Sequence, residues 1–337
     1  MIKVAIAGTG MIAVRAVKAL KQIPGYSVCA IYAREHSLDK GRSLASEAGD
    51  AIVFTDYEQM LSDCGADFVY IGLVNSAHYG YSKKALEAGY NVICEKPFCV
   101  TSKQARELAL IALCNGLYIF EAVTTLHFPN FKALKKLIPS LGNIDLVFGI
   151  YYQYSSRYDK YLKGEVLPVF DPKLAGGCLM DLNCYLVNLV VGLLGTPEST
   201  DYTAEIGFNG IDLAGKVTLS YGKGQGEKRP YRFDPAIILK ASKIESSRPS
   251  MVSIEGQKGR ILIDDSPNFL RHFKLITADG EKEYALNQYE DKMIHEFIDF
   301  KEVYEHRDFG TMRKWLHQAL VVSKILEIDR SRAGLGF

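Results

Sequence analysis

The chain has 337 residues, of which 48% are hydrophobic and 23% charged, and its formal net charge is +1. This composition excludes the disordered and fibrous classes of protein, and the length favours two domains of ordinary size. Because the charge is close to zero, no strongly basic face is indicated, and we expect no nucleic-acid partner.

The cysteines and the N-terminus indicate the compartment. The seven cysteines form no C-x-x-C pair and are scattered among apolar residues, so we expect reduced core thiols rather than disulfides or a zinc site. No basic segment precedes an apolar run at the N-terminus, and the longest apolar run, Tyr185 to Leu194, is too short to span a bilayer. We therefore expect a cytoplasmic protein without a membrane contact.

The first predicted element is a short buried strand over residues 1–7, and the motif G-T-G-M-I-A follows it directly. Gly8 permits a tight turn, Gly10 lets the backbone approach a pyrophosphate, and Ala13 lets the next helix pack close to the strand. A glycine turn that only ends a strand is the alternative. In this context we expect dinucleotide binding by the backbone of five residues: Gly8, Thr9, Gly10, Met11 and Ile12.

Strands and helices then alternate along the first third of the chain. The predicted strands cover residues 26–32, 68–73, 90–94 and 117–121, and the predicted helices cover residues 40–48, 79–88 and 103–115. This alternation predicts right-handed crossovers and a parallel sheet, and therefore a Rossmann-type α/β domain over residues 1–121. Ligands of such a sheet bind at the carboxyl ends of its strands.

The end of the second predicted strand, Tyr32-Ala33-Arg34, indicates the cofactor. NAD-binding proteins usually place an acidic side chain there for the ribose 2′-hydroxyl, whereas a small residue followed by a guanidinium suits a 2′-phosphate. We therefore expect NADP, bound in part by Arg34. Two alternatives remain open: Arg34 is an ordinary surface charge, or Glu35 takes the acidic role and the cofactor is NAD.

The sequence V-I-C-E-K-P-F ends another predicted strand with Glu95, Lys96 and Pro97. Pro97 stops the strand and favours an extended Lys96, so the ammonium is delivered to the ligand edge of the sheet. There a lysine can stabilise charge that develops on a substrate oxygen, or lower the pKa of a neighbouring acid. A capping salt bridge between Glu95 and Lys96 is the alternative without chemistry.

Three motifs, G-T-G-M-I-A, N-S-A-H at residues 75–78 and E-K-P at residues 95–97, together resemble the Gfo/Idh/MocA family of oxidoreductases. The resemblance extends along almost the whole chain. It implies that Lys96 is catalytic and lies between the nicotinamide and the substrate, and that the cofactor site includes Asn75, His78 and Glu95. Val74 departs from the family, which often has proline at this position.

The periodicity changes after the segment 121–132, which is expected to enter a helix near residue 130. Predicted strands cover residues 145–154, 199–208, 215–221, 236–241, 251–255, 260–264 and 273–277. Few helices interrupt them, so we expect an α+β domain over residues 122–337: a large, mainly antiparallel open sheet with helices on one face. The C-terminal helical segment, residues 291–328, is expected to dock back on the first domain. The open face predicts a homodimer or homotetramer.

One predicted helix, residues 175–195, is apolar nearly all round and is therefore expected to be buried. At 100° per residue, Asp181, Tyr185 and Asn188 fall within an arc of roughly 60°. Buried polar groups need partners, which are either other core residues or a substrate rich in hydroxyl groups.

The same segment carries a second signature of the family, with Gly176, Gly177, Asp181 and Tyr185 in register. Many members have histidine at the last position, and Tyr185 resembles the branch of dihydrodiol dehydrogenase, glucose-fructose oxidoreductase and NADP-dependent xylose dehydrogenase. Asn183 departs from the glycine of the family. The resemblance also places a substrate-side loop at residues 152–159.

In that loop, Arg157 and Tyr158 have two interpretations. Either they contact the substrate, or they are ordinary residues at the rim of the site. A metal-assisting pair of Glu121 and Asp181 is another interpretation, but no cluster has the spacing of metal ligands, so no metal is expected.

These observations predict hydride transfer between a nicotinamide and a hydroxyl or carbonyl carbon of a sugar, polyol or vicinal diol. Tyr185 would be the acid/base, and because a tyrosine alone titrates near pH ~10, Lys96 would lower its pKa. Asp181 would orient the lysine or bind a hydroxyl group, and Asn188 would act likewise. The alternative is a dinucleotide sensor without catalysis on the same scaffold.

Overall fold

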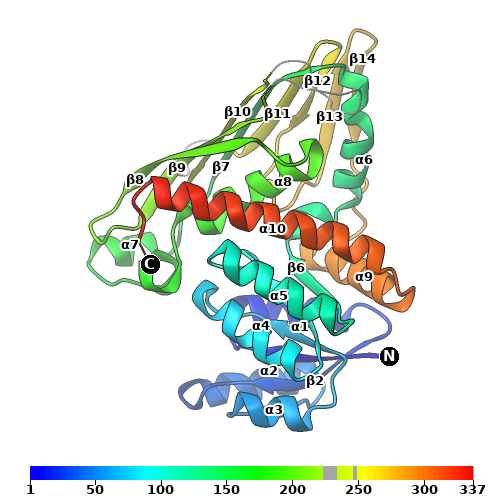
Figure 1. The fold of residues 1–337 in the computed structure, drawn as a ribbon, viewed down its shortest axis with the longest axis vertical. Coiled ribbons are helices and arrows are strands. Elements are labelled where there is room, and N and C mark those ends of the chain that lie inside the picture. Colours follow the sequence, from blue (N-terminus) through cyan, green and yellow to red (C-terminus); the bar gives the residue numbers. More distant parts are fainter. Residues whose placement is uncertain (223–233, 246–248, 337) are drawn as a thin grey trace. The chain divides into compact units, whose positions relative to one another are not determined.

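The computed structural model describes residues 1–222, 234–245 and 249–336. The chain packs as two compact units (Figure 1). The first unit contains Met1–Ala122 and Asp291–Ser323, and the second contains Val123–Glu290 and the chain from Lys324 onward.

The first unit is built on a six-stranded parallel sheet with the strand order β3-β2-β1-β4-β5-β6. Its strands are β1 Ile2–Ala7, β2 Tyr26–Tyr32, β3 Ile52–Phe54, β4 Phe68–Ile71, β5 Asn91–Glu95 and β6 Ile119–Ala122. The order reverses between β1 and β4, so these two strands form the switch point at which such sheets bind ligands. The predicted Rossmann-type parallel sheet is therefore confirmed.

Helices complete the first unit: α1 Met11–Lys21, α2 Leu38–Ala48, α3 Tyr57–Asp63, α4 His78–Glu87, α5 Ser102–Cys114, α9 Lys292–Glu305 and the greater part of α10 Phe309–Arg332. The side chains of Val4, Ile6, Val69 and Ile71 are fully buried, as expected for central strands that are covered on both faces. The strand β3 and the helix α3 were not predicted from the sequence.

The second unit is built on an eight-stranded sheet with the order β14-β13-β12-β11-β7-β10-β9-β8. Its strands are β7 Ile144–Tyr152, β8 Ser199–Ile206, β9 Asp212–Ser220, β10 Ala236–Ser242, β11 Met251–Gly256, β12 Gly259–Ile263, β13 Phe273–Thr277 and β14 Gly280–Tyr284. Among the described strand pairs of this eight-stranded sheet, only β7 and β10 are parallel. The predicted mainly antiparallel sheet is confirmed, although β14 was not predicted.

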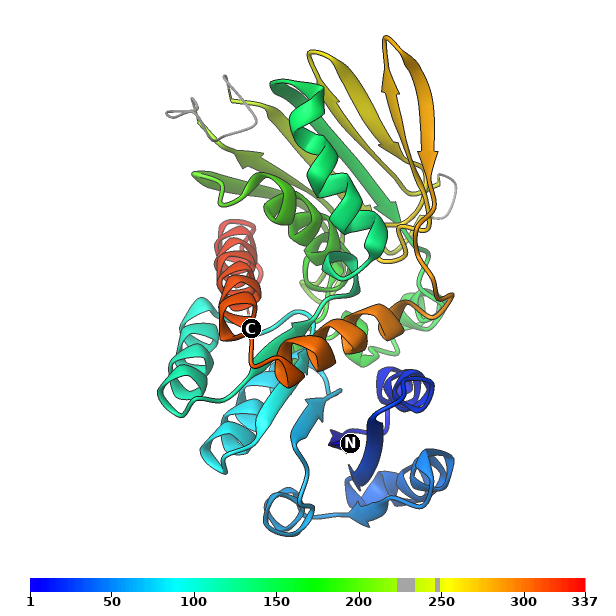
Figure 2. The ribbon, with the colours of Figure 1, turned by 90° about the vertical axis from the view of Figure 1, so that its right-hand side faces the viewer.

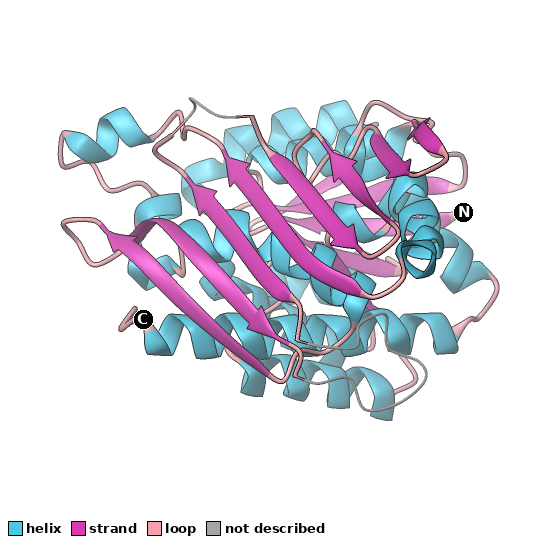
Figure 3. Ribbon diagram, turned by 90° about the horizontal axis from the view of Figure 1, so that it is seen from above, coloured by secondary structure: helices cyan, strands magenta, loops and turns pink. Residues whose placement is uncertain are grey.

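The helices α6 Pro129–Leu137 and α8 Cys184–Leu194 lie on one face of this sheet (Figures 1 and 2). Figure 3 looks onto the opposite face, where the strands lie in front of these helices. Along β8 buried and exposed side chains alternate in the first half of the strand, the pattern of a strand with one covered and one open face.

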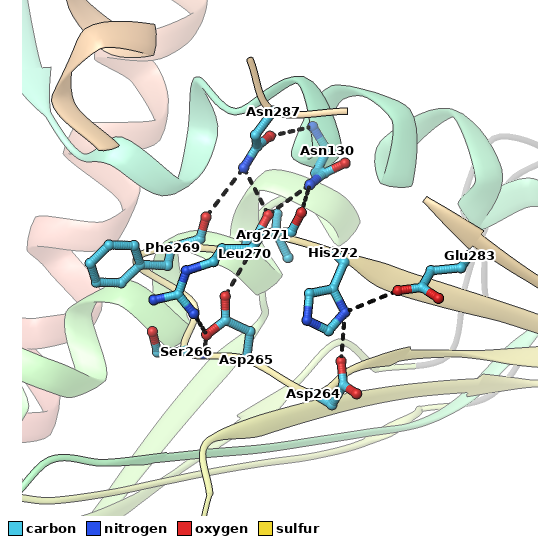
Figure 4. Close-up of polar contacts among 10 residues, drawn as sticks. All are labelled: Asn130, Asp264, Asp265, Ser266, Phe269, Leu270, Arg271, His272, Glu283 and Asn287. Atoms are coloured by element: carbon cyan, nitrogen blue, oxygen red, sulfur yellow. Dashed lines mark hydrogen bonds and ion pairs between the residues drawn. The ribbon is translucent and has the colours of Figure 1, made fainter. Parts of the chain in front are cut away.

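Two asparagines attach the start of α6 to the connection between β12 and β13 (Figure 4). The side-chain amide of Asn130 donates to the carbonyl oxygens of Leu270, at 2.8 Å, and Arg271, at 2.7 Å. The amide of Asn287 also donates to Leu270, at 2.9 Å. Leu270 has a φ of 42°, so these hydrogen bonds hold a left-handed backbone turn. They fix where the second unit begins its first helix.

The apolar segment Pro172–Leu194 is long and apolar enough to cross a membrane, since an 18-residue window of it has a mean hydropathy of 1.6. However, 89% of that window is buried inside the protein. It is not the single helix that the sequence predicts. Gly177 has a φ of 100°, so the helical backbone begins only at Cys178. Residues Leu179–Asn183 then form a π-helical turn before α8.

Candidate active site

The glycine turn after β1 lies at the switch point of the parallel sheet. Gly8 has a φ of 124°, and a Cβ atom there would clash with the carbonyl oxygen of Gly72, which follows the neighbouring strand β4. A Cβ on Gly10, by contrast, would meet no atom within 4 Å. Gly8 is therefore required by the turn itself, whereas Gly10 leaves open space directly before the N-terminus of α1.

This geometry fits the phosphates of a dinucleotide. The first N–H groups of a helix have no partner inside the helix, and the helix dipole favours an anion there. Met11, the first residue of α1, is 60% exposed, while Ala13 is fully buried against the sheet. Thr9 and Ile12 are half-buried in the same turn, and Arg34 is exposed after β2.

The loop that carries Lys96 is held by hydrogen bonds to its neighbours. The hydroxyl of Tyr70 donates to the Glu95 carboxyl at 2.6 Å, and His78 contacts the carbonyl oxygen of Pro97 at 2.9 Å. The backbone N–H of Phe98 donates to the carboxyl of Glu121 at 2.9 Å. The peptide bond between Lys96 and Pro97 is cis. The hydrogen bonds from β4, α4 and β6 therefore hold the Glu95 side chain before Lys96 and the backbone of Pro97 and Phe98 after it.

The N-S-A-H turn supports this loop from the side of β4. His78 is buried, and its second ring nitrogen contacts the carbonyl oxygen of Leu73 at 3.1 Å. Burial lowers the pKa of His78. Asn75 is half-buried at the start of this turn. Val74 has a φ of −69°, which is the value that a proline ring imposes, so the backbone here has the φ that the family's proline would require.

Four ionisable groups near the loop are buried, as Glu95 and Glu296 are, or half-buried, as Glu121 and Lys292 are. Burial raises the pKa of Glu121 to about 8, and it also raises the pKa of Glu95. On α9, burial and the charge of Lys96 lower the pKa of Lys292 to about 8, and burial raises the pKa of Glu296. Sequence reasoning did not single out Lys292 or Glu296, because nothing in the pattern of α9 links it to a loop almost two hundred residues earlier.

In the second unit, the π-helical turn carries Asp181. The carboxylate of Asp181 forms an ion pair with the ammonium of Lys243, which directly follows β10. Lys243 is 3% exposed and Asp181 is 32% exposed. Sequence reasoning missed Lys243, since an isolated lysine after a predicted strand is most often a surface charge.

Asp212, at the start of β9, holds the N-terminus of the same turn. Its carboxylate accepts the backbone N–H of Leu179 at 2.6 Å and the hydroxyl of Tyr202 at 2.7 Å. A Cβ on Gly177 would overlap this carboxylate. The family glycine is therefore needed here because the capping aspartate occupies the space of a side chain.

The other predicted residues have different surroundings. Tyr185 is 7% exposed on α8, and its ring lies edge-on against Tyr151 with centroids 6.1 Å apart. Asn188 is fully buried and donates to the carbonyl oxygen of Cys184 at 3.0 Å, a partner within its own helix. Arg157 is half-buried and precedes α7, Tyr158–Leu162.

The arc predicted for the polar side chains needs a correction. It assumed 100° per residue throughout, but the backbone N–H of Cys184 bonds to the carbonyl oxygen of Leu179, five residues earlier. A π turn contains one more residue than an α turn, so it rotates Asp181 relative to Tyr185 and Asn188. Asn183, where the family has glycine, is fully buried in this turn, and its amide donates to the carbonyl oxygen of Gly215 at 3.5 Å.

Comparison with known proteins gives matches to a family model and to curated relatives. Residues 2–122 match the family model described as the oxidoreductase family with an NAD-binding Rossmann fold. The chain is 31% identical to scyllo-inositol 2-dehydrogenase (NADP(+)) of Bacillus subtilis, over 99% of this chain and 98% of that protein. It is 27% identical to trans-1,2-dihydrobenzene-1,2-diol dehydrogenase of Xenopus laevis, over 82% and 78% of the two chains.

Among solved structures, a 3-ketoreductase from Actinomadura kijaniata in complex with NADP and TDP-benzene has the same fold. Its TM-score is 0.81 at 20% identity, with 98% of this chain and 97% of that chain covered. The resemblance noted in the motifs is confirmed by the near-complete match to the inositol dehydrogenase. The chain belongs to the Gfo/Idh/MocA family of oxidoreductases.

Proposed function

We propose that this protein is an NADP-dependent dehydrogenase or reductase that acts on a CH–OH carbon of a neutral sugar, polyol or vicinal diol. The observation that carries the proposal is the Lys96 loop, whose backbone is fixed through Glu95, Pro97 and Phe98. A lysine that had no role beyond solubility would not need the hydrogen bonds of Tyr70, His78 and Glu121 to hold the residues beside it.

NADP is the cofactor that the residues fit best. The open space at Gly10 and the N-terminus of α1 suit the pyrophosphate, and the exposed Arg34 after β2 suits a 2′-phosphate. The inositol dehydrogenase relative is named for NADP(+). Asn75, His78 and Glu95 belong to the same half of the site, with His78 and Glu95 acting through the loop that they hold.

The chemistry follows from the side chains. NADP, when bound, supplies the acceptor for the hydride that leaves the substrate carbon as its C–O bond becomes C=O. Tyr185 accepts the hydroxyl proton in oxidation and returns it in reduction. Lys96 stabilises the charge that develops on the substrate oxygen and favours the ionised phenol. Asp181 accepts a hydrogen bond from a second hydroxyl group, and Arg157 borders the substrate.

Two further assignments complete the proposal. Residues 1–121, with Asp291–Ser323 of the C-terminal segment packed in the same unit, serve as the dinucleotide domain, and the rest of residues 122–337 serve as the domain for substrate binding and self-association. The partner is a small molecule in the cytoplasm. Because the chain matches the inositol dehydrogenase along almost its whole length, neutral polyols are the first class of substrate to test.

The test is a substrate panel that is followed by the absorbance of reduced nicotinamide. Purified protein is mixed with NADP or NAD and with inositols, aldoses or vicinal diols, beside the Lys96→Ala variant. We expect reduction with NADP and one substrate class, at a rate that Lys96→Ala lowers by about 10² to 10⁴. If no member of the panel reacts while NADP binds tightly, the enzyme proposal is overturned for these substrates. The result would then favour the hypothesis of a dinucleotide sensor.

A further inference from the structure

Lys243 is a buried lysine to which the proposed chemistry gives no role. Its side chain is 3% exposed, and its ammonium pairs with the carboxylate of Asp181, which is 32% exposed. A buried ammonium is stable only with a counter-charge and hydrogen bonds. The ion pair therefore has one end inside the second unit and one end, at Asp181, that reaches the surface of that unit.

Lys243 is itself held in place on several sides. Its backbone N–H donates to the carbonyl oxygen of Leu213 at 2.9 Å. Its own carbonyl oxygen accepts a hydrogen bond from the backbone N–H of Ser155 at 2.8 Å. Its ammonium lies 5.6 Å from the centroid of the Phe170 ring, within the range of a cation–π contact. A lysine with these restraints is a fixed point for Asp181 rather than a mobile surface charge.

The backbone of Asp181 is restrained by a different strand. The π turn packs on β9 and β10. Asp212 at the start of β9 accepts the N–H of Leu179, two residues before Asp181, at 2.6 Å. The main chain of Asp181 is thus held from β9 and its side chain from the end of β10. Single π turns inside helices are frequent at functional sites, where they redirect one side chain.

We propose that Lys243 is the positioning residue for Asp181: it holds the carboxylate in the orientation in which it accepts a hydrogen bond from a substrate hydroxyl group. This inference rests on the proposed function, which assigns Asp181 to substrate binding. A carboxylate offers about four lone-pair positions, so the ion pair leaves acceptor capacity. Because the ammonium is buried and the carboxylate is not, this half of the site favours neutral hydroxyl donors over carboxylated sugars.

The kinetic test uses Lys243→Met, which keeps the length of the side chain and removes its charge, and Lys243→Arg, which keeps the charge. We expect Lys243→Met to lower kcat/KM for the polyol about 10-fold to 100-fold, a coupling typical of residues in contact, with unchanged NADP binding. Lys243→Arg should keep most of the wild-type kcat/KM. Lys136→Met, an exposed lysine on α6, is the matched control and should behave as wild type.

A double variant separates positioning from a general structural role. If Lys243 acts through Asp181, Lys243→Met combined with Asp181→Asn should be no slower than Asp181→Asn alone. Losses that multiply in the double variant, or wild-type kcat/KM in Lys243→Met, would overturn the inference.

Crystal structures of Lys243→Met and Lys243→Arg decide the inference even if the wild type reduces no nicotinamide and the proposed function fails. The inference predicts that the Asp181 carboxylate leaves its wild-type position in Lys243→Met and keeps it in Lys243→Arg. An unmoved Asp181 side chain in Lys243→Met would show that Lys243 does not position it.

Discussion

Tyr185 is the residue on which the proposed proton transfer depends. Replacing it by phenylalanine removes only the hydroxyl, and the ring contact with Tyr151 at 6.1 Å is kept, so the fold should survive. We expect Tyr185→Phe to lower kcat by about 10² to 10⁴, the usual cost of losing a positioned acid/base, while the Kd of NADP is unchanged. Steady-state kinetics beside fluorescence titration measure both quantities. Tyr289→Phe, which alters a 44% exposed tyrosine, is the control, and near-wild-type turnover in Tyr185→Phe would contradict the role.

Glu121 gives the Lys96 loop a pH dependence. Burial raises its pKa to about 8, whereas an unfolded glutamate titrates near 4.5. The folded state therefore binds more protons than the unfolded state between these two values, so the contribution of Glu121 to stability falls as the pH rises from about 4.5 to about 8.

Glu121→Gln keeps an acceptor for the N–H of Phe98 and removes the titration. We expect the variant to gain stability relative to wild type as the pH rises through this window, and the difference in Tm to level off above it. Thermal unfolding from pH 5 to pH 9 measures the difference. A difference that is constant with pH would show that Glu121 does not titrate in the folded protein.

At the scale of elements, the π turn between Gly177 and α8 shapes the substrate half of the proposed site. Gly177→Ala introduces a side chain at a φ of 100° and places it against the Asp212 carboxylate. Gly164→Ala introduces comparable backbone strain, at a φ of 85°, in open space. We expect about 1 to 3 kcal/mol of lost stability for the strain in each variant and a further loss only in Gly177→Ala.

Chemical denaturation of the two glycine variants measures this difference directly. Kinetics add a second comparison, because displacement of Asp212 should also raise KM in Gly177→Ala and leave KM unchanged in Gly164→Ala. Equal losses of stability in the two variants would contradict the capping role of Asp212.

The elements that sequence analysis missed have physical explanations. β3 has three residues, too few for a periodic pattern, and β14 is a charged strand at the edge of its sheet. α3 was detectable, since Asp56 accepts the N–H of Gln59 at 2.9 Å, and an aspartate three residues before a glutamine signals a helix start. The π turn was not detectable, because its signal lies in hydrogen bonds rather than in apolar spacing.

At the scale of the whole molecule, the residue types at the site were more predictable than their partners. Glycine spacing and the E-K-P motif identify Gly8, Gly10 and Lys96 because each is set by the local chain. Lys243 and Lys292 depend on packing between segments far apart in the sequence, 62 residues in the case of Lys243 and Asp181. Their isolated positions carry no local pattern.

The open face of the eight-stranded sheet predicts self-association. Ile238 on β10 is half-buried on that face beside Phe148 of β7, whereas its neighbours Ile237 and Leu239 are buried. A partly exposed apolar row at the centre of a sheet is typical of an interface. We expect a dimer or tetramer for the wild type and a smaller species for Ile238→Glu by light scattering after gel filtration. Lys136→Glu on α6 should not change the mass, and a monomeric wild type would contradict the prediction.

The central claim is that Lys96 and Tyr185 act as one catalytic unit on one substrate. The most direct measurement is the rate of nicotinamide reduction, at saturating NADP and polyol, for wild type, Lys96→Ala, Tyr185→Phe and the double variant. Residues that act as a unit give losses that are far from additive in free energy. We predict that the double variant is about as slow as the slower single variant. If the two losses multiply, or if Lys96→Ala alone keeps wild-type turnover, the account is wrong.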